Sequence, residues 1–472
     1  MPSSTPASRS PKPRPARAGN RLPYALSIEG CLSEAIGPAG LTSAKLELWL
    51  RRVETHLARM RERHDDGSLP LLQIARATAD IEEAEAAYKK LVRGAETVIF
   101  LGTGGSSLGG QTLAQLAGWN IPGDAGPERR KGPRTRFYDN LDARTLERSL
   151  ASLDIEHSRF VVISKSGGTP ETLVQMVAAL GAVKKRGLEG DIKRLFLGLT
   201  EPVRAPSDKA GMKNPLRQMC EHFGIPTLDH HPGIGGRFSA LTNVGLLAAL
   251  SRGLDVRAVR AGAQAVIDDL LKAGTAADCA PALSAAVAVG LMKERGIRTL
   301  VMLPYCDRLE SFGAWFSQLW AESLGKGGEG SSPVAGLGPV DQHSQMQLWM
   351  DGPPEHLITV LRTPAAGTGP KLDAELCRMA GIGFLAGRHV GDLVEAQAHA
   401  IPEALAQAKR PVRTFDMPTL DERAMGALMM HFMLETILAA GLLGIDPFDQ
   451  PAVELGKILA RERLTRNGRN PC

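Results

Sequence analysis

The sequence lacks the features that mark membrane proteins and disulfide-rich secreted proteins. No apolar run predicts a membrane-spanning helix, and no apolar signal segment follows Met1. The six cysteines are scattered and form no Cys-x-x-Cys pair, so neither a zinc site nor a disulfide framework is expected. With 43% hydrophobic and 23% charged residues, the composition is that of a soluble globular protein in a reducing, cytoplasmic compartment.

Acidic residues are missing from the first 22 positions, although basic ones are frequent there. The basic residues of this segment are Arg9, Lys12, Arg14, Arg17 and Arg21. They account for the whole net charge of +5, so the rest of the chain is formally neutral. The folded part therefore has no excess of positive charge with which to bind nucleic acid. Residues 1–24 are rich in Pro, Ser and Arg, which predicts a disordered tail.

Short apolar runs alternate with helix-length segments along the rest of the chain. The predicted strands cover residues 97–101, 136–139, 160–164, 195–200, 299–305, 357–362 and 412–417. This alternation predicts an α/β fold with two doubly wound α-β-α domains and mainly parallel sheets. The predicted units are a helical N-terminal segment over 25–95, a first domain over 96–255 and a second over 256–472, which ends in helices over 422–443 and after Pro451.

A polar loop follows the predicted strand at 160–164. Its polar side chains are those of Ser164, Lys165, Ser166 and Thr169, and two glycines lie between them. Thr169 suits the N-cap and Pro170 the first position of the helix that follows. Bare backbone N–H groups at a helix N-terminus attract anions, so a phosphate monoester site is favoured over an ordinary strand–helix turn.

A second glycine-rich loop, GTGGSSLGG, follows the strand at 97–101. A dinucleotide fingerprint would need glycine where Ser107 stands and an acidic residue about twenty positions later, and neither is present. The lysine of a nucleotide-binding P-loop is missing too. Gly105 and Ser106 are therefore expected to line a second side of a pocket for a small phosphorylated molecule rather than for NAD.

Two further stretches contain groups that can move a proton or stabilise a negative charge. Arg237 follows two glycines and precedes an apolar helical run. In the predicted helix 311–326, Gln318 and Glu322 are four residues apart and share a stripe, and Gly325 predicts a left-handed cap that places Glu322 in the last turn. Glu322 is a candidate base, with an ordinary surface glutamate as the alternative.

Three more candidate site residues lie in the C-terminal half of the chain. His343 lies between Gln342 and Ser344, and Gln450 and Lys457 are spaced to share one helix face. A lone histidine or a near-terminal lysine is also compatible with a surface role. Adjacent histidines such as His230 and His231 point apart in most backbones, so no metal is predicted.

Six stretches together resemble the glucose-6-phosphate isomerase (phosphoglucose isomerase) family. They are GTGGSSLG, SKSGGTPET, GGRFSALTNVGLL, QLWAESLGK, DQHSQMQL and DQPAVELGK, in that order between residues 102 and 457. The first two also resemble the broader sugar-isomerase (SIS) domain. The resemblance implies two SIS-type domains and reversible isomerisation of glucose 6-phosphate to fructose 6-phosphate through a cis-enediol, in glycolysis and gluconeogenesis. No cofactor and no metal are implied.

The resemblance also implies a role for each matching residue. Glu322 would be the base, Arg237 would stabilise the enediol charge, and His343 and Lys457 would open the sugar ring. The implied substrate-binding residues are Gly105, Ser106, Ser164, Lys165, Ser166, Thr169, Gln318 and Gln450. The family's histidine comes from the neighbouring subunit, which implies a homodimer with shared active sites.

The chain departs from the family pattern at two positions, and one alternative function must be weighed. Leu324 stands where the family usually has Asn, and Thr242 where it has Ser. A non-catalytic sugar-phosphate-binding SIS regulator would need the phosphate loops but has no use for Glu322, Arg237, His343 and Lys457 together. The motifs leave open whether mannose 6-phosphate is also a substrate.

Overall fold

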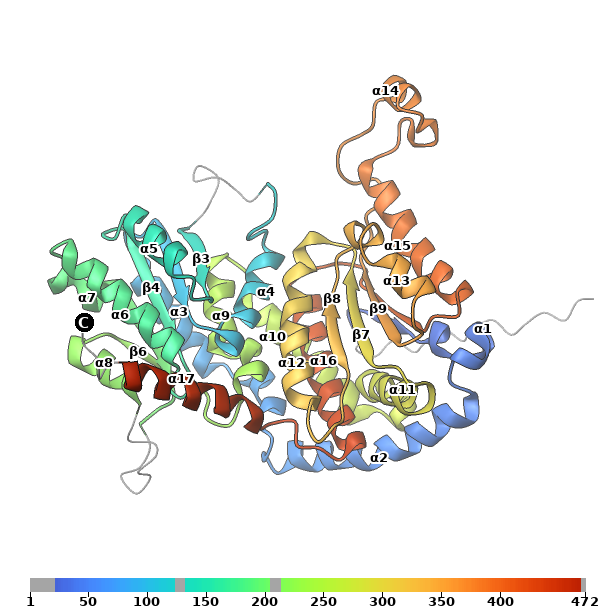
Figure 1. Ribbon diagram of the computed structural model, residues 1–472, viewed down its shortest axis with the longest axis horizontal. Coiled ribbons are helices and arrows are strands. Elements are labelled where there is room, and N and C mark those ends of the chain that lie inside the picture. The colour runs from blue at the N-terminus through green and yellow to red at the C-terminus, as the bar shows by residue number, and fades with distance from the viewer. Residues whose placement is uncertain (1–21, 124–131, 204–213, 468–472) are drawn as a thin grey trace, which may run out of the picture.

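The computed structural model describes residues 22–123, 132–203 and 214–467, so the predicted tail over 1–24 lies almost wholly outside the described residues. Two α/β units lie side by side (Figure 1), each built on a five-stranded sheet. The predicted fold class is confirmed.

The first sheet is entirely parallel, with the strand order β3-β2-β4-β5-β6. Its strands are β2 (Thr97–Leu101), β3 (Arg134–Tyr138), β4 (Ser158–Ile163), β5 (Phe196–Thr200) and β6 (Thr227–Asp229). Four of them were predicted within two residues at each end. The three-residue β6 was missed because it is too short to show a pattern.

Alternate side chains of this sheet enter two separate cores. Val98 and Phe100 of β2 pack on one face, and Ile99 and Leu101 on the other. Helices α3 (Ala79–Leu91) and α9 (Asn243–Ser251) contribute to the first core, and α6 (Pro170–Lys185) and α8 (Pro215–Phe223) to the second. Burial on both faces explains why these strands are continuous apolar runs.

The second sheet has the order β1-β10-β9-β7-β8, and only β1 is antiparallel to its neighbour. Its strands are β1 (Ala25–Ser27), β7 (Thr299–Pro304), β8 (Ser332–Ala335), β9 (His356–Arg362) and β10 (Val412–Asp416). The sequence predicted β7, β9 and β10. It gave no signal for β1, which brings the start of the N-terminal segment onto the edge of the second sheet.

Helix α16 (Glu422–Leu443) forms the centre of the second unit and has the predicted bounds. Asp421 caps it by accepting a hydrogen bond from the Ala424 N–H, and Gly444 ends it at a positive φ of 72°. By length and composition this helix could cross a membrane, contrary to the prediction that no such run exists. However, 83% of its apolar window is buried inside the protein, as in the core helix of a globular domain.

Helices α4 (Leu108–Leu116) and α12 (Glu310–Leu324) join the two units. The Gln115 side chain of α4 accepts a hydrogen bond from the Ser311 N–H at 2.6 Å and donates one to the Glu310 carboxylate at 3.3 Å. Thr112 donates to the Ser311 carbonyl at 3.1 Å. The glycine-rich loop that precedes α4 is therefore fixed relative to α12, which carries Glu322.

Two segments expose apolar side chains that the single chain does not cover. One is the arm formed by α14 (Ala374–Met379) and the following turn η11 (Gly383–Leu385), which projects from the second unit (Figure 1). Its exposed apolar residues include Leu376, Met379 and Phe384. The other is α17 (Glu454–Asn467), which exposes Leu455, Ile458, Leu459 and Leu464.

Candidate active site

The glycine-rich loop after β2 packs directly on the turn that carries Arg237. A Cβ atom added to Gly105 would lie 2.3 Å from the Gly236 carbonyl carbon, so only glycine allows the two backbones to approach so closely. Ser239 donates hydrogen bonds to the carbonyls of Gly105 and Gly236, at 3.3 and 2.7 Å. The loop and the turn η7 (Gly236–Leu241) thus form one rigid unit.

The same loop also reaches α12 and the end of β4. A Cβ atom on Gly104 would lie 2.9 Å from Gln318 Nε2, and one on Gly102 would lie 3.1 Å from both the Ile163 carbonyl and Ser106 Cβ. The predicted cradle residue Ser106 is therefore next to the start of the loop 164–169. The structure brings the two loops to the same place, as expected for two sides of one pocket, and places the α12 helix beside them.

The loop 164–169 presents hydroxyl groups in front of α6. Ser164 is buried and its hydroxyl donates to Thr169 Oγ1 at 3.0 Å, whereas Ser166 is exposed and accepts from the Gly168 N–H at 3.3 Å. Thr169 occupies the predicted N-cap position, but its side chain makes no capping bond because its hydroxyl lies against Ser164. The N-terminal N–H groups of α6 lie next to these hydroxyls, which is a suitable setting for a phosphate.

Lys165 is anchored within this loop region. Its ammonium group donates to the Ile234 carbonyl at 3.1 Å and lies 3.7 Å from the Glu201 carboxylate. Gly167, with a φ of 66°, leaves room for Asn214, because a Cβ atom there would lie 1.6 Å from Asn214 Oδ1. The shape of the loop thus depends on contacts with the turns after β5 and β6.

Glu322 lies in the last turn of α12, as predicted, with its side chain 33% exposed. Gln318, one turn earlier, donates from Nε2 to Glu322 Oε1 at 3.0 Å, and the second oxygen, Oε2, lies 3.1 Å from Arg237 Nη1. The predicted left-handed cap is wrong: Gly325 has a φ of −77°. Leu324, where the family usually has Asn, is fully buried in the core and takes no part in this network.

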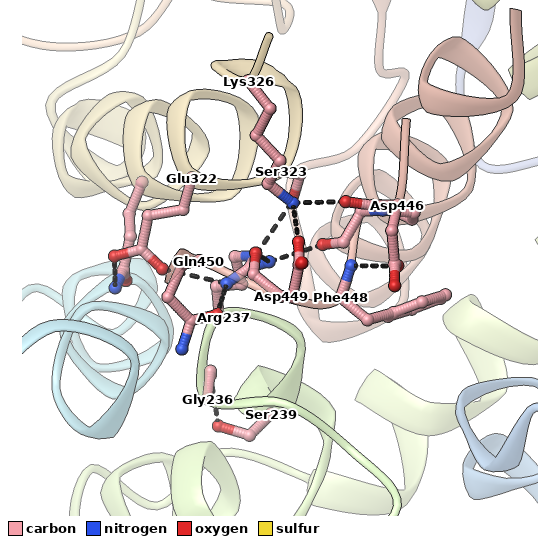
Figure 2. Close-up of polar contacts among 12 residues, drawn as sticks. Gly236, Arg237, Ser239, Glu322, Ser323, Lys326, Asp446, Phe448, Asp449 and Gln450 are labelled. Atoms are coloured by element: carbon pink, nitrogen blue, oxygen red, sulfur yellow. Dashed lines mark hydrogen bonds and ion pairs between the residues drawn. The ribbon is translucent and has the colours of Figure 1, made fainter. Parts of the chain in front are cut away.

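Arg237 is the centre of the polar network (Figure 2). Its side chain is 4% exposed, and all five N–H donors of its guanidinium have protein acceptors. The acceptors are Ser323 Oγ, Glu322 Oε2, Gln450 Oε1 and the carbonyls of Pro447 and Asp449. Burial lowers the pKa of Arg237, and the adjacent Glu322 carboxylate opposes that shift, so the guanidinium stays charged.

Gln450 belongs to the loop between α16 and the turn η12 (Pro451–Val453). Its amide oxygen accepts from Arg237 Nη1 at 2.8 Å. The prediction that Gln450 and Lys457 share one helix face is wrong, because Gln450 precedes a proline and has a non-helical backbone with a φ of −156°. Only Lys457 lies in α17.

The structure does not bring His343 and Lys457 to Glu322 within the described single chain. His343 follows the short turn η10 (Val340–Gln342) and its side chain is exposed. Lys457 is half-exposed and pairs with Glu454 on its own helix, with Nζ 2.7 Å from the carboxylate. Both roles stay predictions.

Four residues of the network were not predicted as part of the site. Ser323, Pro447 and Asp449 supply acceptors to Arg237, and Lys326 forms an ion pair with Asp449 at 2.6 Å. Ser323 and Lys326 belong to a stretch already singled out around Glu322. The carbonyl groups of Pro447 and Asp449 carry no side-chain signal and could be found only from the fold.

Comparisons with known proteins define the class to which the chain belongs. The family model of phosphoglucose isomerase matches residues 82–337 and 383–469. Together with the two SIS-type sheets and the paired Glu322 and Arg237, this match makes the chain an aldose–ketose isomerase of sugar phosphates. His343 lies between the two matched segments.

Relatives with similar sequences specify the family. The chain is 35% identical to the glucose-6-phosphate isomerase of Rubrobacter xylanophilus, over 79% of this chain and 84% of the relative. It is 30% identical to a probable glucose-6-phosphate isomerase of Methanococcus maripaludis, over 93% of both chains. The chain belongs to the phosphoglucose isomerase family.

Solved structures agree at the level of the fold. A hypothetical protein from Thermus thermophilus superposes with a TM-score of 0.78 at 29% identity, over 93% of this chain and 99% of the other. A glucose-6-phosphate isomerase from Chlamydia trachomatis gives a TM-score of 0.65 at 24% identity, over 88% of this chain and 76% of the other.

Proposed function

We propose that this chain interconverts D-glucose 6-phosphate and D-fructose 6-phosphate through a cis-enediol, with Glu322 as the base that carries the proton between C1 and C2. The observation that carries the proposal is the position of Glu322, whose two oxygens are held by Gln318 and Arg237 beside the Gly104–Gly105 loop. One carboxylate can serve both carbons because they are adjacent and the same proton leaves one and returns to the other.

Arg237 balances the charge of the reaction. Before proton transfer, its positive charge faces the Glu322 carboxylate at 3.1 Å. When Glu322 takes the proton from carbon, it becomes neutral and the negative charge moves to the substrate oxygen. The guanidinium stays charged, and Nη1 can exchange its bond to Glu322 for one to the enediolate. The site therefore holds one positive and one negative charge at every stage.

The loop 164–169 and Ser106 hold the 6-phosphate in this proposal. The exposed Ser166 hydroxyl and the N-terminus of α6 offer donors, and Thr169 and Ser164 lie immediately behind them. Gln318 Oε1 is buried without a hydrogen bond in the described structure and lies near Gly104. It can therefore accept a hydrogen bond from a hydroxyl group of the sugar. Phosphate binding then fixes the reacting carbons against Glu322, and binding energy lowers the barrier.

A homodimer completes the site. His343 is exposed, and we assign it to the active site of the neighbouring subunit, where it would open the sugar ring. The arm around α14 supports a second copy as partner, because Leu376, Met379 and Phe384 form an apolar surface far from the body of the single chain. Burying such side chains is favourable by about 1.5–3 kcal/mol each.

Lys457 would share the ring-opening step once α17 is packed. In the single chain every residue from Glu454 to Arg466 is exposed, and four of them are leucine or isoleucine. An isolated 14-residue helix is marginally stable in water, so a packed position of α17 in the assembly would stabilise it. That position is proposed to place Lys457 beside the substrate ring.

The cellular role follows from this reaction. The substrate is a small sugar phosphate, and the isomerisation belongs to glycolysis and gluconeogenesis in the cytoplasm. The chemistry needs neither a redox cofactor nor a metal, because the electrons stay on the sugar and Arg237 supplies the positive charge. No nucleic-acid or membrane partner is proposed.

Replacement of the base tests the proposal. Glu322→Gln should lower turnover of fructose 6-phosphate by about 10²–10⁴-fold in a coupled assay, while the substrate still binds. Glu329→Gln is the matched control, because Glu329 is a similarly exposed glutamate (36%) that pairs with Lys293. Near-normal turnover in Glu322→Gln would refute the assignment, and binding without turnover in the natural protein would favour a non-catalytic regulator.

A further inference from the structure

The acceptors around Arg237 form two walls that belong to different parts of the chain. One wall is the last turn of α12, with Glu322 and Ser323. The other is the loop 446–450, which contributes two carbonyl groups and the Gln450 amide. Arg237 satisfies all its donors only while both walls stay at their present separation.

The loop wall has little support of its own. Of residues 446–450, only Pro447 is buried, and the loop joins the end of α16 to a short turn. Within the loop, the Phe448 N–H donates to Asp446 Oδ1 at 2.9 Å. The Phe448 ring packs on Phe238, with 5.5 Å between the ring centroids. These contacts shape the loop but do not tie it to α12.

Lys326 makes the direct connection between the two walls. It lies two residues beyond the end of α12, and its ammonium group donates to the Asp446 carbonyl and pairs with Asp449 Oδ1 at 2.6 Å (Figure 2). The Lys326 side chain is 15% exposed and the Asp449 side chain is 57% exposed, so water is excluded from the lysine side of the ion pair only. Among the described residues, no other hydrogen bond or ion pair directly joins residues 310–326 to residues 446–450.

We propose that Lys326 is a positioning residue for the isomerisation: by pairing with Asp449 it holds the loop of Gln450 at the distance from Glu322 that lets Arg237 bridge both. The inference rests on the proposed roles of Glu322 and Arg237. Lys326 does not touch the reacting atoms in this scheme. Its hydrogen bond to Asp449 lowers the pKa of that carboxyl.

The expected consequence is a loss confined to the chemical step. Without Lys326 the loop 446–450 can move away from α12. Arg237 can then donate hydrogen bonds to α12 or to the loop, but not to both. The charge that must stabilise the enediolate becomes less well placed, whereas the phosphate loop on the first sheet is unaffected. We expect Lys326→Met to lower kcat about tenfold, equivalent to about 1.4 kcal/mol, with KM changed less than about twofold.

Four variants, beginning with Lys326→Met, and one control test this. Lys293→Met is the control, because Lys293 also forms a 2.6 Å ion pair, with Glu329 just after α12, but does not reach the loop 446–450. Asp449→Ala removes the partner, and the double variant with Lys326→Met should lose little more than Lys326→Met alone. Lys326→Arg should recover most of the lost turnover, because it restores the charge at the same place.

A ligand measurement separates positioning from a general effect on folding. A phosphorylated hydroxamate shaped like the enediolate should bind Lys326→Met more weakly by the same factor as kcat/KM falls, while fructose 6-phosphate binds as before. Equal weakening of both ligands, additive losses in the double variant, or kinetics like those of Lys293→Met would each overturn the proposal. If Lys326→Met does not fold, Asp449→Ala, with its 57% exposed side chain, gives the same comparison.

Different results would contradict the proposed function and the positioning role of Lys326. If the natural protein does not turn over fructose 6-phosphate, or if Glu322→Gln remains active, the proposed function is wrong whatever Lys326 does. If Glu322→Gln is inactive and Lys326→Met behaves like the Lys293 control, only the positioning role is wrong.

Discussion

Replacing Arg237 by lysine separates the charge of this residue from its geometry. The change keeps one positive charge in the site, but a lysine has three N–H donors where arginine has five. Arg237 now serves five acceptors, so at least two of them lose their partner in Arg237→Lys. An ammonium group also lacks the extended planar fork with which the guanidinium serves both walls of the site, because its three donors leave from a single nitrogen.

The structure gives the size of the effect. Two of the five acceptors, Ser323 Oγ and the Pro447 carbonyl, lie in buried hydrogen bonds with Arg237, so water cannot easily replace a donor lost there. Each buried acceptor left without a partner costs about 1–3 kcal/mol, which makes about 2–6 kcal/mol for two. Even the lower figure, if felt in the transition state, lowers kcat/KM about thirtyfold.

A coupled isomerase assay together with urea unfolding measures both parts of this cost. The control is Arg257→Lys, an arginine with a 51% exposed side chain that donates two hydrogen bonds to Glu85. Exposed pairs of this kind contribute about 0–1 kcal/mol, so the control should change little. If Arg237→Lys keeps the kcat/KM of the natural protein, the reaction does not depend on the five donors of the guanidinium.

Three further predictions concern the phosphate loop, the ring-opening step and the core. Ser166→Ala combined with Thr169→Ala should raise KM several-fold with a smaller change in kcat, since donors to the phosphate are lost; an unchanged KM in steady-state kinetics contradicts the cradle. His343→Ala should slow the closed-ring substrate more than an open-chain analogue, and equal losses would speak against ring opening. Glu435→Gln should destabilise the protein by about 3–5 kcal/mol in urea unfolding, because it leaves the fully buried Arg413 charge, 2.7 Å away, without its counter-ion; a loss below about 1 kcal/mol would show that this charge is solvated in another way.

The sequence predicted those parts of the fold in which local pattern and tertiary structure agree. The bounds of α16 follow from Asp421 and Gly444, which provide a cap and a stop at the ends of an apolar segment. The pair Gln318 and Glu322 follows from helical spacing alone, and their side chains are 3.0 Å apart. Fully buried parallel strands such as β4 are also visible as apolar runs.

Other parts depend on contacts between distant segments. Strand β1 has three residues and exists because Ala25–Ser27 pairs with β10, almost 400 positions later. The shared helix face proposed for Gln450 and Lys457 was wrong although a signal was present: Pro451 disfavours a helical backbone at the residue before it. The cage around Arg237 could not be predicted, because two of its five acceptors are backbone carbonyls more than 200 positions away in the chain.

The placement of the site across the contact of α4 with α12 has a consequence for how the protein can be divided. Under the proposed function, the phosphate loops and Arg237 belong to the first half of the chain, and Glu322, Gln318 and Gln450 to the second, so neither half alone would hold a working catalyst. If the chain is cut between the two sheets, each of the two fragments should be inactive by itself. Turnover should return only when the fragments reassemble. The rate can therefore be changed by anything that alters the contact of α4 with α12. A displacement of catalytic groups by about 1 Å is enough to lower activity about a hundredfold.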